Sequence, residues 1–500
     1  MRAHPGRFRP ILTTVIVVLL LLAGWLVVEA YFALTARPNV DTDYGAQLEA
    51  LAASVQPDGP DRWWAYEEAV ESFRTELKAA ESAMPTGWAE LSLDLSVVYD
   101  AEFWSRNAIR SESYRGMQTE DALAAIEAAR DSYIAWLRGE GGRALGRVMA
   151  LRSSDARFVS PWPREGMLIE QALFMDLGAA REVARGLGAA GVLAIDSADW
   201  AAYLETVESS LWLSSAISYQ PTLIHHLVAT AIRSLMLEHL VRRPLMDGLL
   251  PADVLAEVHA CLGRWPIVGP AHALHGERLW VMDAIQHTHD TRGRAIVAEQ
   301  QRILRGLSPD DQGVPRILNM ISVFVPRRVE AERAAEGYFD LAIQDIERPA
   351  SEQWRAGSRS EAFETFADSS SLFGALLPAF GSFYMSVRQH ELDSIGVRTL
   401  IAMERCRLET GSLPATLDDL VPTYLDAVPI DPLADPDGTP LRYVVLDEPD
   451  AVDRRYLLYS VGLDRTDDGG VQAQDVRFAA LRPGNEGTDF VINASEPSAE

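Results

Sequence analysis

The residues with the clearest chemical potential form a short acidic loop near the C-terminus. Asp464, Thr466, Asp468, Gly469 and Asp475 occupy positions 1, 3, 5, 6 and 12 of a twelve-residue run. In calcium loops, oxygen ligands at positions 1, 3, 5 and 12 converge on the ion, and a glycine at position 6 permits the sharp turn. The spacing therefore predicts a calcium site whose ligands are Asp464, Thr466, Asp468 and Asp475.

This loop differs from an EF-hand in two ways. Position 3 is Thr466, and position 12 is Asp475 instead of the longer, bidentate glutamate; a β-rich segment, not a helix, precedes the loop. Calcium still suits such a site because it accepts six to eight hard oxygen ligands in flexible geometry. The expected role of the ion is structural, since it would neutralise clustered carboxylates and fix the C-terminal hairpin. The alternative is an ordinary solvated turn in a chain with 72 acidic residues.

The elements that must position this loop are a long helix and two strands. Apolar residues recur on one helical face between 383 and 409, and Gly411 is the expected terminator of that helix. Residues 441–446 and 456–461 are rich in β-formers and bounded by turn residues. They predict an antiparallel pair of strands that ends where the acidic loop begins.

The order of these motifs resembles the globular domain of the major pseudopilins of type II secretion. The resemblance covers about 80 residues, from 399 to 478, and rests on these motifs: Gly411-x-x-Pro414, Asp431-Pro432, Leu441-Arg442-Tyr443, Tyr459-Ser460-x-Gly462-x-Asp464 and Asp475-Val476. It implies a small α+β module over 383–482, a calcium ion bound by the loop, and an extracytoplasmic address. It also implies association with a type II secretion or pilus-like system. The N-terminus lacks the processing site and the early glutamate of that family, so the resemblance is confined to the C-terminal module.

The N-terminus predicts a membrane anchor. Residues 11–34 are almost entirely apolar, three arginines precede them, and about 20 such residues suffice to cross a bilayer. The positive-inside rule places residues 1–9 in the cytoplasm, an anchor at 10–35 in the inner membrane, and the remainder outside. A cleaved signal peptide is the alternative, but Val28-Glu29-Ala30 is a poor cleavage site.

Between the anchor and the C-terminal module the pattern is mainly helical. Residues 36–60 contain three prolines and predict a tether, and residues 61–382 predict a helical ectodomain, an irregular bundle or solenoid-like array. The clearest pair of helices covers 199–217 and 222–241, with Asp199 and Thr222 as N-caps. The polar tail 483–500 predicts disorder. The whole arrangement resembles membrane-anchored bacterial proteins of planctomycete-type genomes, a likeness that implies no known activity.

Composition limits the partners. The net charge of −27 disfavours nucleic acid, so we expect contacts with other envelope proteins and, through the N-terminal helix, with the membrane. Only two cysteines are present, Cys261 and Cys406, which excludes a disulfide framework and leaves open whether the two pair.

Three further patterns carry weaker chemical signals. His272, His275 and Glu277 could ligate zinc, but the chain has no His-Glu-x-x-His motif; His225 and His226 fit a buried helix better than a site. The glycines of 186–191 match the dinucleotide spacing within a helical pattern, which favours helix packing. No nucleophile motif is present. The sequence therefore predicts a non-enzymatic, membrane-anchored extracytoplasmic scaffold; the alternative is a hydrolase-like envelope enzyme with a site in the helical domain.

Overall fold

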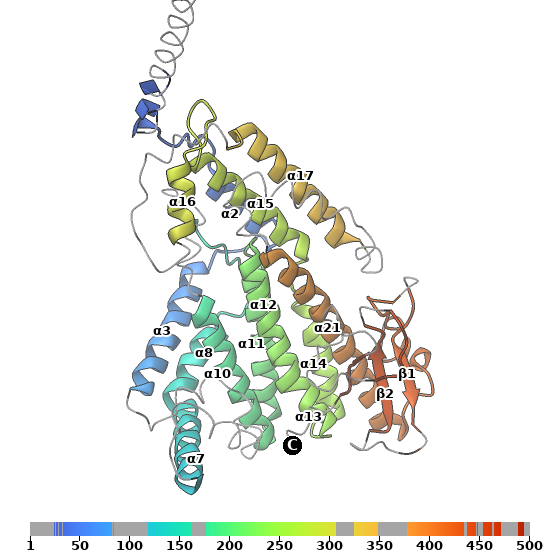
Figure 1. Ribbon diagram of the computed structural model, residues 1–500. Helices are drawn as coiled ribbons and strands as arrows, with labels where there is room; N and C mark the ends of the chain where they lie inside the picture. Colours follow the sequence, from blue (N-terminus) through green and yellow to red (C-terminus); the bar gives the residue numbers. More distant parts are fainter. Residues whose placement is uncertain are drawn as a thin grey trace, which may run out of the picture.

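The chain is mainly helical and carries one small antiparallel sheet. The computed structural model describes residues 25–82 (except 26, 29 and 33), 84, 119–162, 177–306, 325–348, 378–434, 438–446, 448, 454–462, 465–471 and 489–494. The helices are α2 (Tyr44–Ser54), α3 (Trp63–Glu81), α7 (Thr119–Trp136), η2 (Leu137–Gly141), α8 (Gly142–Met149), α10 (Leu177–Asp196), α11 (Trp200–Ser218), α12 (Leu223–Met236), η3 (Leu237–Arg242), α13 (Arg243–Met246), α14 (Ala252–Arg264), α15 (Pro270–His287), α16 (Val297–Gly306), α17 (Arg328–Glu347), α21 (Pro378–Thr410) and η5 (Leu417–Leu420). Figure 1 shows them as a helical body with the sheet at one end.

The predicted pair of helices at the centre of the body is confirmed. Asp199 caps α11 because its carboxylate accepts a hydrogen bond from Ala202 N at 3.1 Å. Thr222 caps α12 in the same way, with its hydroxyl accepting from His225 N at 3.4 Å. The second helix does not stop cleanly, since it continues into the π-helical turn η3.

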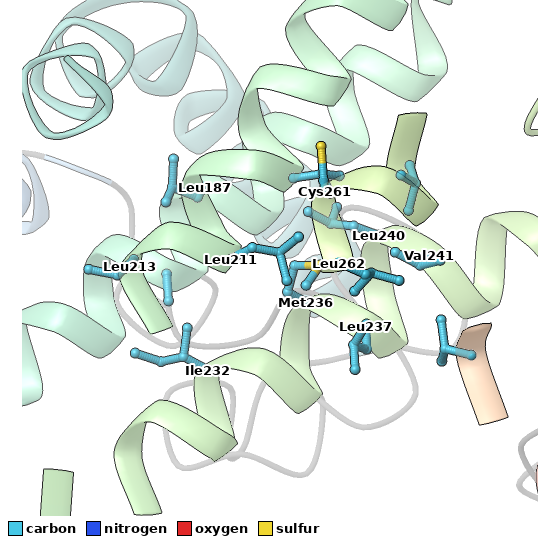
Figure 2. Close-up of a cluster of buried hydrophobic side chains, with 14 of the residues drawn as sticks. Leu187, Leu211, Leu213, Ile232, Met236, Leu237, Leu240, Val241, Cys261 and Leu262 are labelled. Atoms are coloured by element: carbon cyan, nitrogen blue, oxygen red, sulfur yellow. The ribbon is translucent and has the colours of Figure 1, made fainter. Parts of the chain in front are cut away.

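The main hydrophobic core lies where α10, α11, α12, η3 and α14 meet. Figure 2 shows this cluster, to which each of these elements contributes a leucine or isoleucine. The contributing side chains are at most 4% exposed: Leu187, Leu211, Ile232, Leu240 and Leu262. Full burial of such a side chain stabilises the fold by about 1.5–3 kcal/mol, so this cluster holds the helices together.

The predicted long helix before the C-terminal module is confirmed as α21, and Gly411 ends it with φ +80°. The helix packs against α12 and α14 of the body. Leu400 of α21 and Leu458 of the sheet belong to the same core as the body helices. The predicted division at residue 382 therefore runs through a shared core, because α21 is apolar on more than one side.

The sheet is three-stranded, in the order β1 (Arg442–Val445), β2 (Tyr456–Ser460), β3 (Phe490–Val491). The predicted antiparallel pairing of the first two strands is confirmed, with Tyr443 opposite Leu458. The third strand lies in the segment 483–500, and the prediction of disorder over that whole segment was wrong. Phe490 is fully buried, and Asn493 Nδ2 donates to Tyr456 O at 2.7 Å. Pairing with β2 orders these residues, whose apolar run Phe490-Val491-Ile492 is too short to predict a strand by itself.

The segment 36–60 is not an extended tether, because it contains α2. Asp43 caps this helix through its bond from Ala46 N, and Leu48 and Ala52 are fully buried. These two residues, one helical turn apart, form an apolar stripe; α2 packs on α15, and Leu48 belongs to the same hydrophobic cluster as Leu274 of α15. The stripe is short and lies between prolines, and this is why the composition of the segment indicated a tether.

Residues 25–35 are helical where they are described, and most of the predicted anchor lies outside the described residues. Within the part of the chain that the structure describes, no helix has both the length and the apolar content that a membrane span requires.

Candidate functional site

The loop after β2 is held at its start by a buried aspartate. Asp431 is 2% exposed, and its Oδ1 accepts hydrogen bonds from Leu433 N at 2.9 Å and Ser460 Oγ at 2.8 Å. Its Oδ2 accepts from Val461 N at 3.0 Å. The carboxylate therefore joins the turn before β1 to the end of β2, and fixes the point from which the acidic loop leaves the sheet.

Within the loop, Asp467 has a structural role. Its Oδ1 accepts hydrogen bonds from Tyr459 Oη at 2.9 Å and Gly469 N at 3.1 Å, and its Oδ2 lies 3.0 Å from Arg442 Nε. Gly469 and Gly470 have φ of +75° and +82°, values that glycine adopts without strain. The loop thus folds back on the sheet and leaves the neighbouring carboxylate, Asp468, facing inward.

Asp489, just before β3, meets this loop. It is 1% exposed; its backbone N donates to Val471 O at 2.8 Å, and its Oδ2 accepts from Gly470 N at 2.7 Å. Its Oδ1 and Oδ2 of Asp468 are both buried, and neither accepts a hydrogen bond from any described residue. A buried carboxylate oxygen without a partner is costly unless a proton or a cation satisfies it.

Electrostatics agree with this geometry. Burial and the negative charges of Asp468 and Asp467 together raise the pKa of Asp489 to about 6, although the backbone N–H groups of Gly470 and Asp468 oppose the rise. Any cation placed between Asp468 and Asp489 would relieve this repulsion.

The predicted ligands divide between described and undescribed positions. Thr466 and Asp468 lie in the described part of the loop, whereas Asp464 and Asp475 lie outside the described residues. Asp489 was missed by sequence reasoning; its signal was an aspartate followed by the apolar run Phe490-Val491-Ile492 in an otherwise polar tail. Among the residues that the structure describes, no three His, Cys, Asp or Glu side chains are grouped so that they could hold a metal ion.

The histidine-rich stretch on α15 is occupied by structural contacts. His272 Nε2 lies 3.0 Å from Tyr219 O, and Glu277 Oε2 accepts from Leu223 N at 3.3 Å, next to the start of α12. Burial raises the pKa of Glu277 to about 7. These contacts fasten α15 to the end of α11 and the start of α12.

The two histidines predicted for the core are buried, which confirms that prediction. His225 and His226 are 2% and 3% exposed, and burial lowers their pKa values to about 3 and about 4. His225 Nδ1 lies 2.7 Å from Thr222 Oγ1, inside the first turn of α12. Both rings are therefore neutral at physiological pH.

The glycines of 186–191 lie within α10, not in a strand-to-helix turn. A Cβ at Gly186 would meet Phe73 at 2.8 Å, and one at Gly191 would meet Leu240 at 2.8 Å. These glycines allow close helix packing, which confirms the prediction that their dinucleotide-like spacing serves packing. Cys261 and Cys406 are both buried free thiols, which answers the question that the sequence left open.

No family model, no curated protein and no solved structure matches this chain.

Proposed function

We propose that this protein is a membrane-anchored extracytoplasmic scaffold whose C-terminal module holds a structural calcium ion. The observation that carries the proposal is the pair of buried, unpartnered oxygens, Asp468 Oδ2 in the loop with calcium-site spacing and Asp489 Oδ1 just before β3. Ca²⁺ would supply charge neutralisation and a fixed link between the loop and β3. Asp468 and Asp489 would hold it, together with Thr466 and, by their spacing, Asp464 and Asp475.

The anchoring part of the proposal draws on the helix at residues 25–35. Five of its described side chains are apolar and exposed: Trp25 46%, Val27 70%, Val28 60%, Tyr31 70% and Leu34 60%. Exposed apolar surface of this kind is unfavourable in water and favourable in hydrocarbon. The same residues continue the apolar run that begins at Ile11. This supports an N-terminal anchor, with the body outside the cytoplasm by the positive-inside rule.

The scaffold part of the proposal rests on how polar groups are used in the body. The buried groups Asp431, Asp489 and His272 each tie neighbouring elements together, and His225 contacts the Thr222 cap of α12. Association with a type II secretion or pilus-like system rests on the resemblance of residues 399–478 to pseudopilins. The role we propose is to present the C-terminal module to other envelope proteins.

Calcium titration of the full chain in detergent tests the ion. Asp468→Asn and Asp489→Asn should each weaken binding in calorimetry, because each removes a charged ligand while preserving shape. Asp418→Asn, at an exposed carboxylate of η5, is the matched control and should bind as the wild type does. At a calcium concentration of about 100 Kd, the wild type should gain about 2.7 kcal/mol of unfolding free energy.

A second readout separates ion binding from simple misfolding. Without calcium, Asp489→Asn should be at least as stable as the wild type at pH 8, because it removes one of several like charges around a buried oxygen. Absence of calcium binding by the wild type, with no change in its stability on adding the ion, would remove calcium from the proposal.

A further inference from the structure

We propose that one face of the helical body lies against lipid headgroups and binds their phosphates through Arg37, Arg292 and Arg327. This anchor face consists of residues 36–43, 287–296 and 325–329. The inference rests on the proposed membrane anchoring, and adds to it the orientation of the body and the chemistry of the contact.

The chain that follows the N-terminal helix is fastened to the body at once. Asn39 N donates to His289 O at 2.8 Å, and Arg328 Nη1 donates to Asn39 O at 3.0 Å. The Asp41 carboxylate receives both Nη groups of Arg328, at 2.8 and 2.9 Å. The guanidinium of Arg294 lies 3.7 Å from the centre of the Phe32 ring. This face therefore lies only a few residues along the chain from the point at which the helix would enter a bilayer.

Gln286, in the last turn of α15, adds a second attachment. Its Oε1 accepts hydrogen bonds from Asp41 N at 3.2 Å and Thr42 N at 3.1 Å, and its Nε2 donates to Thr42 O at 2.9 Å. In Figure 1 the blue segment leaves the body at the top of the view, beside the loop after α15 and the start of α17. β1 and β2 lie toward the opposite end.

The loop after α15 and the start of α17 form one surface. Arg328 N donates to Gly293 O at 3.0 Å, and His289 Nε2 lies 3.4 Å from Pro326 O. Arg292 directly precedes Gly293, and Arg327 directly precedes Arg328, so the bond between Arg328 N and Gly293 O brings the two arginines to one surface. Arg37 lies two residues before Asn39, which bonds to the same elements. All three arginines are exposed.

The acidic groups of the anchor face are already engaged. Asp41 and Glu332 pair with Arg328, and Asp290 accepts backbone N–H bonds from Arg292 and Arg294 in its own turn. Asp43 accepts from Ala46 N at 2.8 Å as the N-cap of α2. Glu330, the residue after this face, accepts from Arg327 N at 2.9 Å in the first turn of α17.

The cations that remain are available to a ligand. No carboxylate among the described residues forms an ion pair with Arg37, Arg292 or Arg327. The same face carries two exposed valines, Val40 with 54% and Val329 with 52% of its surface exposed. A guanidinium binds phosphate oxygens in a bidentate manner, and apolar side chains partition into the headgroup boundary. Cations and valines together, at the exit of an apolar helix, fit the surface of a bilayer better than a soluble anion.

The test uses the full chain in nanodiscs that contain phosphatidylglycerol and a nitroxide-headgroup lipid. Val329→Cys and Val444→Cys, two exposed valines, carry a bimane label in separate samples; Val444 lies on β1. We expect headgroup quenching at 329 to exceed that at 444 at least about twofold, and to fall when the three arginines are replaced together by glutamine. A matched triple variant, Arg138→Gln, Arg143→Gln and Arg181→Gln, removes exposed arginines from η2, α8 and α10 and should leave quenching unchanged.

Extraction with alkaline carbonate separates this inference from the function on which it rests. Release of the chain from native membranes would refute the anchor itself. A chain that stays in the membrane, yet shows equal quenching at the two positions, would overturn the anchor face alone. Quenching at 329 that survives the arginine-to-glutamine triple variant would overturn the role of the three cations.

Discussion

Replacing His226 with phenylalanine tests how the helical body responds to acid. The His226 ring is 3% exposed and lies 5.3 Å from the ring of Phe383, centroid to centroid. Burial, with a smaller contribution from the nearby His272, lowers the pKa of His226 to about 4. In the unfolded chain the ring protonates near its ordinary pKa of 6.5. The stability that neutral His226 contributes is therefore full above pH 6.5 and is lost as the pH falls toward 4.

The magnitude follows from the two pKa values. At pH 5.5, protonation stabilises the unfolded chain by about 1.4 kcal/mol, and the folded ring remains neutral. At pH 7.5 the same effect is below about 0.1 kcal/mol. The wild type should therefore lose about 1.3 kcal/mol more than His226→Phe between these two pH values. Phenylalanine keeps the aromatic contact with Phe383 but cannot bind a proton.

Urea-induced unfolding in detergent, followed by tryptophan fluorescence at both pH values, gives this difference. Glu277 and Asp489 have raised pKa values, so they stabilise the fold as the pH falls, with the opposite sign to His226. Both groups are present in both proteins, and their contributions cancel in the comparison. If the stability difference between the two proteins is the same at pH 5.5 and pH 7.5, His226 does not stay neutral in the fold and the reasoning fails.

Three further substitutions test the packing and capping described above by denaturant unfolding. Gly276→Ala should cost about 3 kcal/mol or more, because its Cβ would lie 1.5 Å from Pro221 O; the control Gly263→Ala, with no atom within 4 Å, should be neutral or stabilising by up to about 1 kcal/mol. Asp199→Ala should cost about 1 kcal/mol through loss of the α11 cap, and an unchanged midpoint would contradict that role. Asp431→Ala should cost about 2–3 kcal/mol and expose the end of β2 to limited proteolysis, since three hydrogen bonds are lost.

Helices whose apolar residues keep helical spacing over several turns were predictable, because this signal lies within one continuous segment. α21 carries its apolar residues at helical spacing and ends at a glycine, so both its course and its end could be read from the sequence. α2 and β3 were missed for two different reasons. Leu48 and Ala52 give only one turn of apolar stripe, and Phe490 and Val491 are ordered by a strand that lies about 30 residues earlier.

The acidic site, too, was predictable only where its residues lie close together in the sequence. Asp468 was predicted from its spacing to Gly469, a relation within one loop. Asp489 owes its role to the pairing of β3 with β2, which brings it to Gly470 from 19 residues away. Spacing rules describe ligands supplied by a continuous segment, and they do not reach a carboxylate that tertiary structure delivers. A search for aspartates directly before short apolar runs would have raised Asp489 as a candidate.

The C-terminal module shares a hydrophobic core with the body, so it is held more rigidly than a domain joined to the body only by a linker. Gly396 of α21 lacks a side chain, and Ile492, just after β3, fills the space; a Cβ at Gly396 would lie 2.6 Å from Ile492 Cγ2. The same helix also packs on α12 and α14, so α21 carries contacts both to the sheet region and to the body. Since residues 39–42 fasten the N-terminal segment to α15 and α17, the acidic loop cannot reorient freely with respect to that segment. If the N-terminal helix is held in a membrane, the height and direction of the acidic loop are set by packing, which is the property that a scaffold requires.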